Sequence, residues 1–312
     1  MKERIDIEQA IFAVHGANSP PRLLARSAAF LDDWLGPATN LCSGFGERPL
    51  GVVCPESIFA KPLDKHHVAV VQAADQGTDD GGRPTVLCFR MLIVSRRHYT
   101  EMQGDPFALV ACFPPPWHVR GELPALAWPD GLPGDRSVAE IQQILKRPDS
   151  AALLGGAQAL VDGACVCFER DAPDPDLIRS LWKLLPSSTR SSLWPASFAF
   201  DNALGFDGLV VPSVRGKNIA GYLTEEQAAE YPEGRYELHL QIAAEAGDQD
   251  ELNALFARRS RAQTWQLGIL LLVIVVALAL AMKVLSPTPQ MRPRPNTPAL
   301  IRPYAAISEL MA

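Results

Sequence analysis

The chain has 312 residues, of which 47% are hydrophobic and 21% are charged, and its formal net charge is −6. Residues 258–312 hold seven basic residues and one acidic residue, so residues 1–257 carry 22 basic and 34 acidic residues, a net charge of −12. Phosphate backbones repel a domain of that charge, and the sequence shows no basic patch to offset it, which argues against nucleic-acid binding.

The N-terminus favours a cytoplasmic protein. It reads Met-Lys-Glu-Arg-Ile-Asp-Ile-Glu, and its acidic residues interrupt any apolar region of the kind that a secretory signal needs. The six cysteines lie mostly inside apolar runs, and a core of this size needs no disulfides. We therefore expect buried free thiols and an N-terminal part that stays in the cytoplasm.

Residues 1–113 are predicted to form a first α/β lobe. Residues 9–15 indicate a strand, and residues 22–35 carry an apolar stripe that predicts a helix. The β-rich runs 67–73 and 85–94 flank a segment rich in glycine and aspartate, which is typical of an antiparallel hairpin.

Residues 114–135 are predicted to form a proline-rich connection. Six of these 22 residues are proline, which favours extended backbone and disfavours the interior of a helix or a sheet. The triple proline at 114–116 is also typical of a ligand for an aromatic groove. Trp117 and Trp128 favour packing of the segment on its own domain instead.

Residues 136–245 are predicted to form a second α/β lobe. Helices are expected over 137–146, from Pro148 to a glycine stop at Gly163, and over 176–185, the last capped by Asp174 with Pro175 in its first turn. Strands are expected over 164–169, 196–200 and 208–211. The overall prediction is a mixed α/β (α+β), two-lobed domain.

Residues 246–264 are predicted to form a helical stalk that leads into a transmembrane helix over 265–285. The run from 267 to 282 holds no charge, and the 21 residues from Trp265 to Leu285 would span roughly the 30 Å hydrocarbon core of a bilayer. The alternative, a buried core helix, would need a domain around it, yet only 27 residues follow Leu285 and six of them are proline. Residues 286–312 are expected to form an extended, proline-rich tail.

The membrane anchor is therefore expected to comprise Trp265, Leu267 and Leu285, with the lipid bilayer as one partner. Juxtamembrane basic residues flank it: Arg258, Arg259 and Arg261 before it and Lys283 after it. These charges either contact anionic headgroups or only stop transfer of the chain. Basic residues are balanced on the two sides, so the orientation rests on the missing signal: a single-pass membrane protein with its N-terminal domain in the cytoplasm.

No catalytic, cofactor or metal motif is recognisable. The stretch around Gly216 lacks the first glycine and the Ser or Thr of a phosphate-binding loop. The six histidines are scattered, with no Cys-x-x-Cys and no His-Glu-x-x-His, so we expect no metal and no cofactor.

A binding surface is the most specific site that the residues indicate. His15 stands at the end of a predicted strand with Arg22 close behind it, and strand ends and loops commonly carry function. Asp201, Asn202 and Asp207 lie in an aromatic-rich segment that offers both apolar anchors and polar groups. The alternatives are a structural turn histidine and a buried strand and turn.

Two stretches resemble a known family. Residues 177–200 combine a helix, Leu-Leu-Pro, an arginine and a leucine with a phenylalanine-rich strand, and His15-Gly16 followed by Arg22-Leu-Leu-Ala-Arg-Ser forms the opening. Together they resemble bacterial GTPase-associated protein 1, with Pro20-Pro21 in place of Gly-His. The resemblance implies a non-enzymatic adaptor that works beside a small GTPase in a bacterial multiprotein system.

These observations predict a membrane-tethered interaction or adaptor module with a protein partner, and the resemblance implies that this partner is a small GTPase. One alternative is a membrane-tethered hydrolase, with His15 as the base and Asp201 or Asp207 as its carboxylate. Another is an accessory subunit of a membrane complex in which the apolar helix mediates assembly.

Overall fold

The computed structural model describes residues 6–16, 19–78, 84–131, 134, 136–258, 268–278 and 280. The chain divides into two compact units, residues 1–264 and residues 265–312. Each unit is described separately below.

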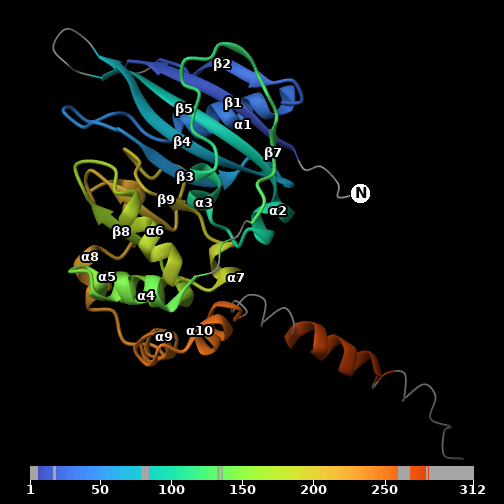
Figure 1. Cartoon of the computed structure of the whole chain (residues 1–312), viewed down its shortest axis with the longest axis vertical. Coiled ribbons are helices and arrows are strands. Elements are labelled where there is room, and N and C mark those ends of the chain that lie inside the picture. The colour runs from blue at the N-terminus through green and yellow to red at the C-terminus, as the bar shows by residue number, and fades with distance from the viewer. Residues whose placement is uncertain are drawn as a thin grey trace, which may run out of the picture. The chain divides into compact units, whose positions relative to one another are not determined.

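The first unit is a mixed α/β fold built on one ten-stranded sheet (Figure 1). The strands are β1 (Asp6–His15), β2 (Arg22–Ser27), β3 (Ser57–Pro62), β4 (His67–Thr78), β5 (Pro84–Ser95), β6 (Gly121–Leu123), β7 (Leu126–Ala127), β8 (Val166–Glu169), β9 (Pro195–Ala196) and β10 (Gly208–Val211). Their order is β6-β2-β1-β5-β4-β3-β9-β10-β8, and β7 pairs with β1. The mixed α/β prediction is confirmed at this level.

Helices connect and cover these strands. They are α1 (Leu35–Ser43), α2 (Arg96–Glu101), α3 (Pro106–Ala111), α4 (Val138–Leu145), α5 (Ser150–Asp162), α6 (Pro175–Leu184), α7 (Ser187–Arg190), α8 (Glu225–Ala229), α9 (Arg235–Ala246) and α10 (Gln249–Phe256), with short 3₁₀ turns η1 (Asp32–Trp34) and η2 (Lys217–Ile219).

The hairpin and the capped helices are confirmed. Strands β4 and β5 pair antiparallel along nearly their whole length. Ser137 and Glu140 form a capping box at the start of α4, and Asp174 accepts a hydrogen bond from the Leu177 amide at the start of α6. Gly163 ends α5 in the left-handed conformation that glycine adopts without strain. These elements form where local signals and packing agree.

The helix predicted over 22–35 is wrong. Residues 22–27 form β2, which pairs antiparallel with β1, and only Leu35 begins a regular α-helix. Leucine, alanine and arginine favour a helix only weakly, whereas pairing along β1 satisfies the backbone groups of this segment. Ala25 and Ser27 are buried by that pairing. The sheet therefore overrides the local preference.

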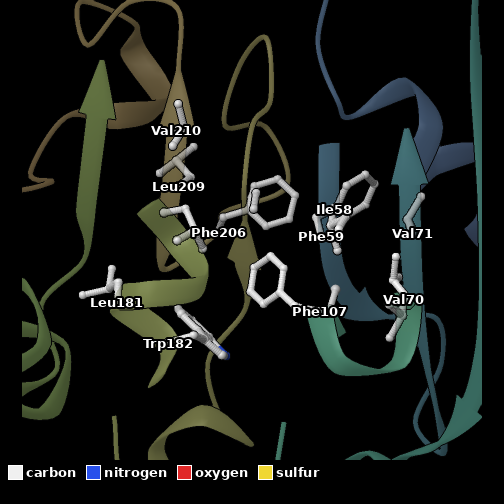
Figure 2. Close-up of a cluster of buried hydrophobic side chains, with 14 of the residues drawn as sticks. Ile58, Phe59, Val70, Val71, Phe107, Leu181, Trp182, Phe206, Leu209 and Val210 are labelled. Carbon is white, nitrogen blue, oxygen red and sulfur yellow. The ribbon is translucent and has the colours of Figure 1, made fainter. Parts of the chain in front are cut away.

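The two halves of the unit share one sheet and one core. Strands β1 to β5 form an antiparallel part, β8 and β10 run parallel, and β3 joins the two parts through β9 at the pair Phe59–Ala196. Figure 2 shows Phe107 of α3 and Phe206 between side chains of β3 and β4 and those of α6. Both the strand pairing and the hydrophobic core therefore cross the expected boundary between the lobes.

The proline-rich segment packs on the antiparallel part. It contributes β6, which pairs with β2 at the sheet edge, and β7, which pairs with β1. Arg90 of β5 is 1% exposed and donates hydrogen bonds to the side-chain oxygens of Gln9 and Gln72 and to the carbonyl of Phe113. Gln9 in turn donates to the Pro124 carbonyl at 2.7 Å. This buried network fastens the segment to the sheet.

Helix α10 is held against the body of the unit. Arg136 donates to the carbonyls of Lys183 and Leu185 at the end of α6, and its guanidinium carbon lies 3.6 Å from the ring centroid of Phe256. Gln249 accepts from the Val138 amide and donates to the Arg136 carbonyl. The predicted stalk over 246–264 is described only as far as Arg258, and over 249–256 it is this packed helix.

In the second unit, residues 268–278 are helical. The large aliphatic side chains described there, ten from Ile269 to Leu280, are each at least 50% exposed. Among the described residues, no helix is both long enough and apolar enough to cross a membrane. Nine of the 21 residues of the predicted span over 265–285, among them Trp265, Leu267, Lys283 and Leu285, lie outside the described residues, as does the tail over 286–312.

Candidate functional site

A cavity of about 950 Å³ opens at one end of the antiparallel sheet. Its walls come from the ends of β1 and β5, from α1, from the loop of residues 46–53, from residues 19–21 and from Phe200. The volume lies at the upper end of the range of ligand pockets in proteins. We call this cavity the β1–α1 pocket and residues 46–53 the rim loop.

The sheet wall of the pocket follows from strand periodicity. Val14 of β1 faces Leu87 of β5 in the antiparallel register. Thr85, Leu87 and Phe89 alternate along β5 and so share one face of the sheet with Val14. The pocket therefore lies on a continuation of the apolar core face toward solvent.

Helix α1 supplies the opposite wall through Thr39, Cys42 and Ser43. Below them the buried ring of Phe45 lies edge-on to the rings of Phe89 and Phe200, with centroids 5.4 and 5.1 Å apart. Phe89 and Phe200, packed edge-to-face on Phe45, form the apolar floor of the pocket.

The rim loop is fixed by one ion pair. Arg48 makes a bidentate pair with Asp75, donates to the Val52 carbonyl at 3.0 Å, and lies over the Phe200 ring at 5.0 Å. Asp75 also accepts from the Cys54 amide at 2.7 Å. Because the Val52 carbonyl and the Cys54 amide both bond to this ion pair, the rim loop is held in place without regular secondary structure.

Gly46 allows the loop to approach the segment after Phe200. Its φ is +98°, and a Cβ there would lie 2.7 Å from the Asp201 nitrogen. Any side chain would clash with backbone, so glycine is required at this position.

The chemistry of the pocket is that of contact and hydrogen bonding. Apolar walls are interrupted by the hydroxyls of Thr39, Ser43 and Thr85 and by the charges of Glu47 and Arg48. Burial raises the pKa of the Cys42 thiol, so at neutral pH it stays protonated and is a poor nucleophile. Such a lining suits recognition of a largely apolar group with a few polar contacts.

His15 and Arg22 lie beside the pocket rather than in its lining. His15 is exposed at the end of β1, next to the lining residue Gly16, and Arg22 is exposed at the start of β2, next to Pro21. The two residues predicted from the strand ends therefore adjoin the lining of the pocket and do not belong to it.

Asp201 and Asn202 organise the loop after Phe200. Asp201 accepts from the Asn218 side chain at 2.7 Å, and buried Asn202 accepts from the Phe206 amide at 2.8 Å and donates to the Asn218 carbonyl. In the described part of the chain, no hydrogen bond or ion pair joins His15 to Asp201 or Asp207. The described residues therefore provide no contact between the base and the carboxylate of the hydrolase alternative.

Asp207 belongs to a second polar cluster, between β3 and the parallel strands. It accepts from the Trp194 amide at 2.7 Å, and burial raises its pKa. Nearby Lys61 is 8% exposed, donates to the Gly205 carbonyl at 2.6 Å, and has a pKa lowered to about 8 by burial despite the opposing charge of Asp207. Cys165 lies 3.9 Å from Asp207, and burial raises the pKa of this thiol too.

A smaller cavity of about 340 Å³ lies between α4 and α6. Its charged residues are all paired: Lys183 with Glu140, Arg179 with Asp176, and Arg147 with Asp149, which lies outside the lining. This cavity therefore offers no unbalanced charge to a ligand.

Of the juxtamembrane residues, only Arg258 is described. It is exposed, and its carbonyl accepts a hydrogen bond from Ser188 at 2.7 Å. Arg259 and Arg261 lie outside the described residues.

The rim loop was missed in the sequence, although Gly46, Pro49 and Gly51 mark it as irregular. Within the described ranges, no group of three or more histidine, cysteine or acidic side chains is placed to hold a metal ion. No protein-family model matches the chain, and no curated protein matches it.

Proposed function

We propose that the chain is a membrane-tethered adaptor, in which the first unit binds a protein partner and the apolar C-terminal segment anchors it in the bilayer. The observation that carries the tether is the exposure of ten aliphatic side chains between Ile269 and Leu280 on a helical stretch outside the first unit. Water-exposed aliphatic surface of that extent is unfavourable unless lipid or protein covers it.

The sequence around that stretch extends the same argument. The uncharged run from 267 to 282 and the flanking Trp265 and Lys283 fit one membrane span with interfacial anchors. In this proposal the span covers 265–285, and the first unit faces the cytoplasm.

The adaptor role rests on the β1–α1 pocket. Its lining offers apolar contact without an activated nucleophile. The resemblance to GTPase-associated protein 1 supports a small GTPase as the partner, and this partner is part of the proposal.

Membrane extraction tests the tether. Full-length protein should stay in the membrane pellet after alkaline carbonate washing, whereas the double variant Leu271→Asp and Val275→Asp should move to the supernatant, because two buried carboxylates oppose insertion. The double variant Leu238→Asp and Ile242→Asp, on exposed positions of α9, is the matched control and should stay in the pellet. Release of the unaltered protein by carbonate would reject the tether.

Thiol labelling tests the orientation. Cys112 is the exposed thiol of the described residues. A membrane-impermeant maleimide should label it only after the cells are opened, and labelling in intact cells would place the first unit on the outer side.

Tagged full-length protein purified in mild detergent should retain a small GTPase. If it retains none while carbonate resistance persists, the GTPase is removed from the proposal and the tether is not.

A further inference from the structure

Exposed aliphatic side chains in the first unit gather around the β1–α1 pocket. Six large hydrophobic residues described there are exposed, and three of them belong to the rim loop or to the helix that walls the pocket: Leu35, Leu50 and Val53. Leu50 is 99% exposed. The other three are Leu31, which precedes η1, and Leu238 and Ile242 of α9.

Three of these residues extend the pocket outward. Leu35 lies one helical turn before Thr39 on α1, and Thr39 lines the pocket, so Leu35 continues its wall along the helix. Leu50 and Val53 stand on the rim loop. We call Leu35, Leu50 and Val53 the outer apolar surface.

A small molecule held in the cavity would leave Leu35 and much of the 99% exposed Leu50 side chain in water. A chain segment that places one anchor in the cavity and lies along α1 would cover both. The geometry therefore favours a macromolecular ligand over a small one.

The charges favour a basic segment. The lining cation Arg48 is neutralised by Asp75, and Arg26 of β2 is paired with Asp32 at 2.5 Å. Lining residue Glu47 is exposed, and the described part of the chain provides no counterion for it. Residues 1–257 carry a net charge of −12, which attracts cations over a longer range.

We infer that the β1–α1 pocket and the outer apolar surface dock an amphipathic segment of a partner protein, with aliphatic or aromatic anchors flanked by lysine or arginine. This inference rests on the proposed adaptor function and specifies its partner chemistry.

The test uses full-length protein in phosphatidylcholine nanodiscs and a fluorescent amphipathic peptide made only of leucine and lysine. Its anisotropy is compared with that of the same peptide carrying glutamate in place of lysine, with empty nanodiscs as the blank. The lysine peptide should bind at least about tenfold more tightly.

Two variants locate the binding. The pair Leu35→Ser and Leu50→Ser should weaken binding about tenfold or more, while the matched pair Leu238→Ser and Ile242→Ser on α9 should leave it unchanged. Thr39→Trp, which places a ring in the cavity, should also weaken binding, with circular dichroism confirming that each variant is folded.

An equal loss of peptide affinity in the two double variants, or equal affinity of the unaltered protein for the two peptides, would overturn the inference. Tighter binding of a peptide comprising residues 286–312 would assign the surface to this chain's own tail. Binding of anilinonaphthalene sulfonate that Thr39→Trp abolishes, without peptide binding, would assign it to a small apolar ligand. Because carbonate extraction is measured separately, each of these results leaves the tether standing.

Discussion

At the residue scale, this protein keeps several cations in its interior without giving each a carboxylate. Arg90 is satisfied by two glutamine oxygens and a carbonyl, and Arg136 by the carbonyls that end α6. Burial lowers the pKa of Arg90 to about 10 and that of Arg136 to about 9, which still leaves both charged at neutral pH. Each positive charge therefore joins segments that are distant in sequence through neutral side-chain or backbone oxygens.

Lys61 makes stability depend on pH. Its pKa is about 8 in the folded protein against 10.5 for the ordinary side chain, so between these values the unfolded chain holds a proton that the folded chain does not. The free energy of unfolding should therefore rise as pH increases from about 8 to about 10.5. Urea unfolding at a series of pH values should show that rise, and Lys61→Met should reduce it. Exposed Lys217→Met is the control, and an unchanged slope in Lys61→Met would contradict the assignment.

At the element scale, α10 is attached through three buried side chains, Leu252, Leu255 and Phe256. Phe256 is 4% exposed and lies under the guanidinium of Arg136. The helix has only eight residues, too few to be stable without packing.

Phe256→Ala should therefore release α10 from the body. Loss of its burial should lower the free energy of opening this helix by about 3 kcal/mol. Hydrogen exchange measured by mass spectrometry should quicken over 249–258 while β4 and β5 stay protected. Leu238→Ala, on an exposed position of α9, should change neither region. Faster exchange throughout the unit would show instead that α10 opens only with global unfolding.

Local sequence signals account for the elements that carry their own boundaries. The capping box of Ser137, the cap and first-turn proline at Asp174–Pro175, and the stop at Gly163 each act within a few residues. The strand β2 has no such signal, and its state is decided by pairing with β1. Helix propensity alone therefore points the wrong way there.

The pocket could not be predicted from the sequence, for a related reason. Val14, Cys42, Arg48, Leu87 and Phe200 line it from five separate segments, and no spacing in the sequence relates them. The prediction reached His15 and Arg22 because strand ends near loops are exposed. It could not show that Pro21 and the rim loop, rather than those charges, face the cavity.

At the scale of the whole molecule, the shared sheet and core make the first unit one cooperative body. Trp182 of α6 is 1% exposed, and its indole nitrogen donates to the carbonyl of Gly104 at 3.0 Å. Gly104 precedes the proline-rich segment in the sequence and Trp182 follows it. A change at this contact should be felt in both halves.

Trp182→Ala should destabilise the unit by about 3 to 5 kcal/mol. Urea unfolding in detergent should be monitored by hydrogen exchange in β4–β5 and in α5. Both regions should show the same transition, and the variant's midpoint should lie at a lower urea concentration than that of the unaltered protein in both. Half-buried Trp128→Ala should shift it less. Separate midpoints for the two halves would show that they unfold independently.

The joint between β3 and β9 has a consequence for synthesis. Ser57 donates to the carbonyl of Phe198, 141 residues later, and the Ile58 amide donates to Ser197. At roughly 5 to 20 residues per second, a ribosome needs about 7 to 28 s to deliver that partner. During this interval the outer edge of β3 has no partner strand, and open strand edges are templates for pairing with other chains. The nascent chain is thus most exposed to misassembly while residues 58–198 are being made.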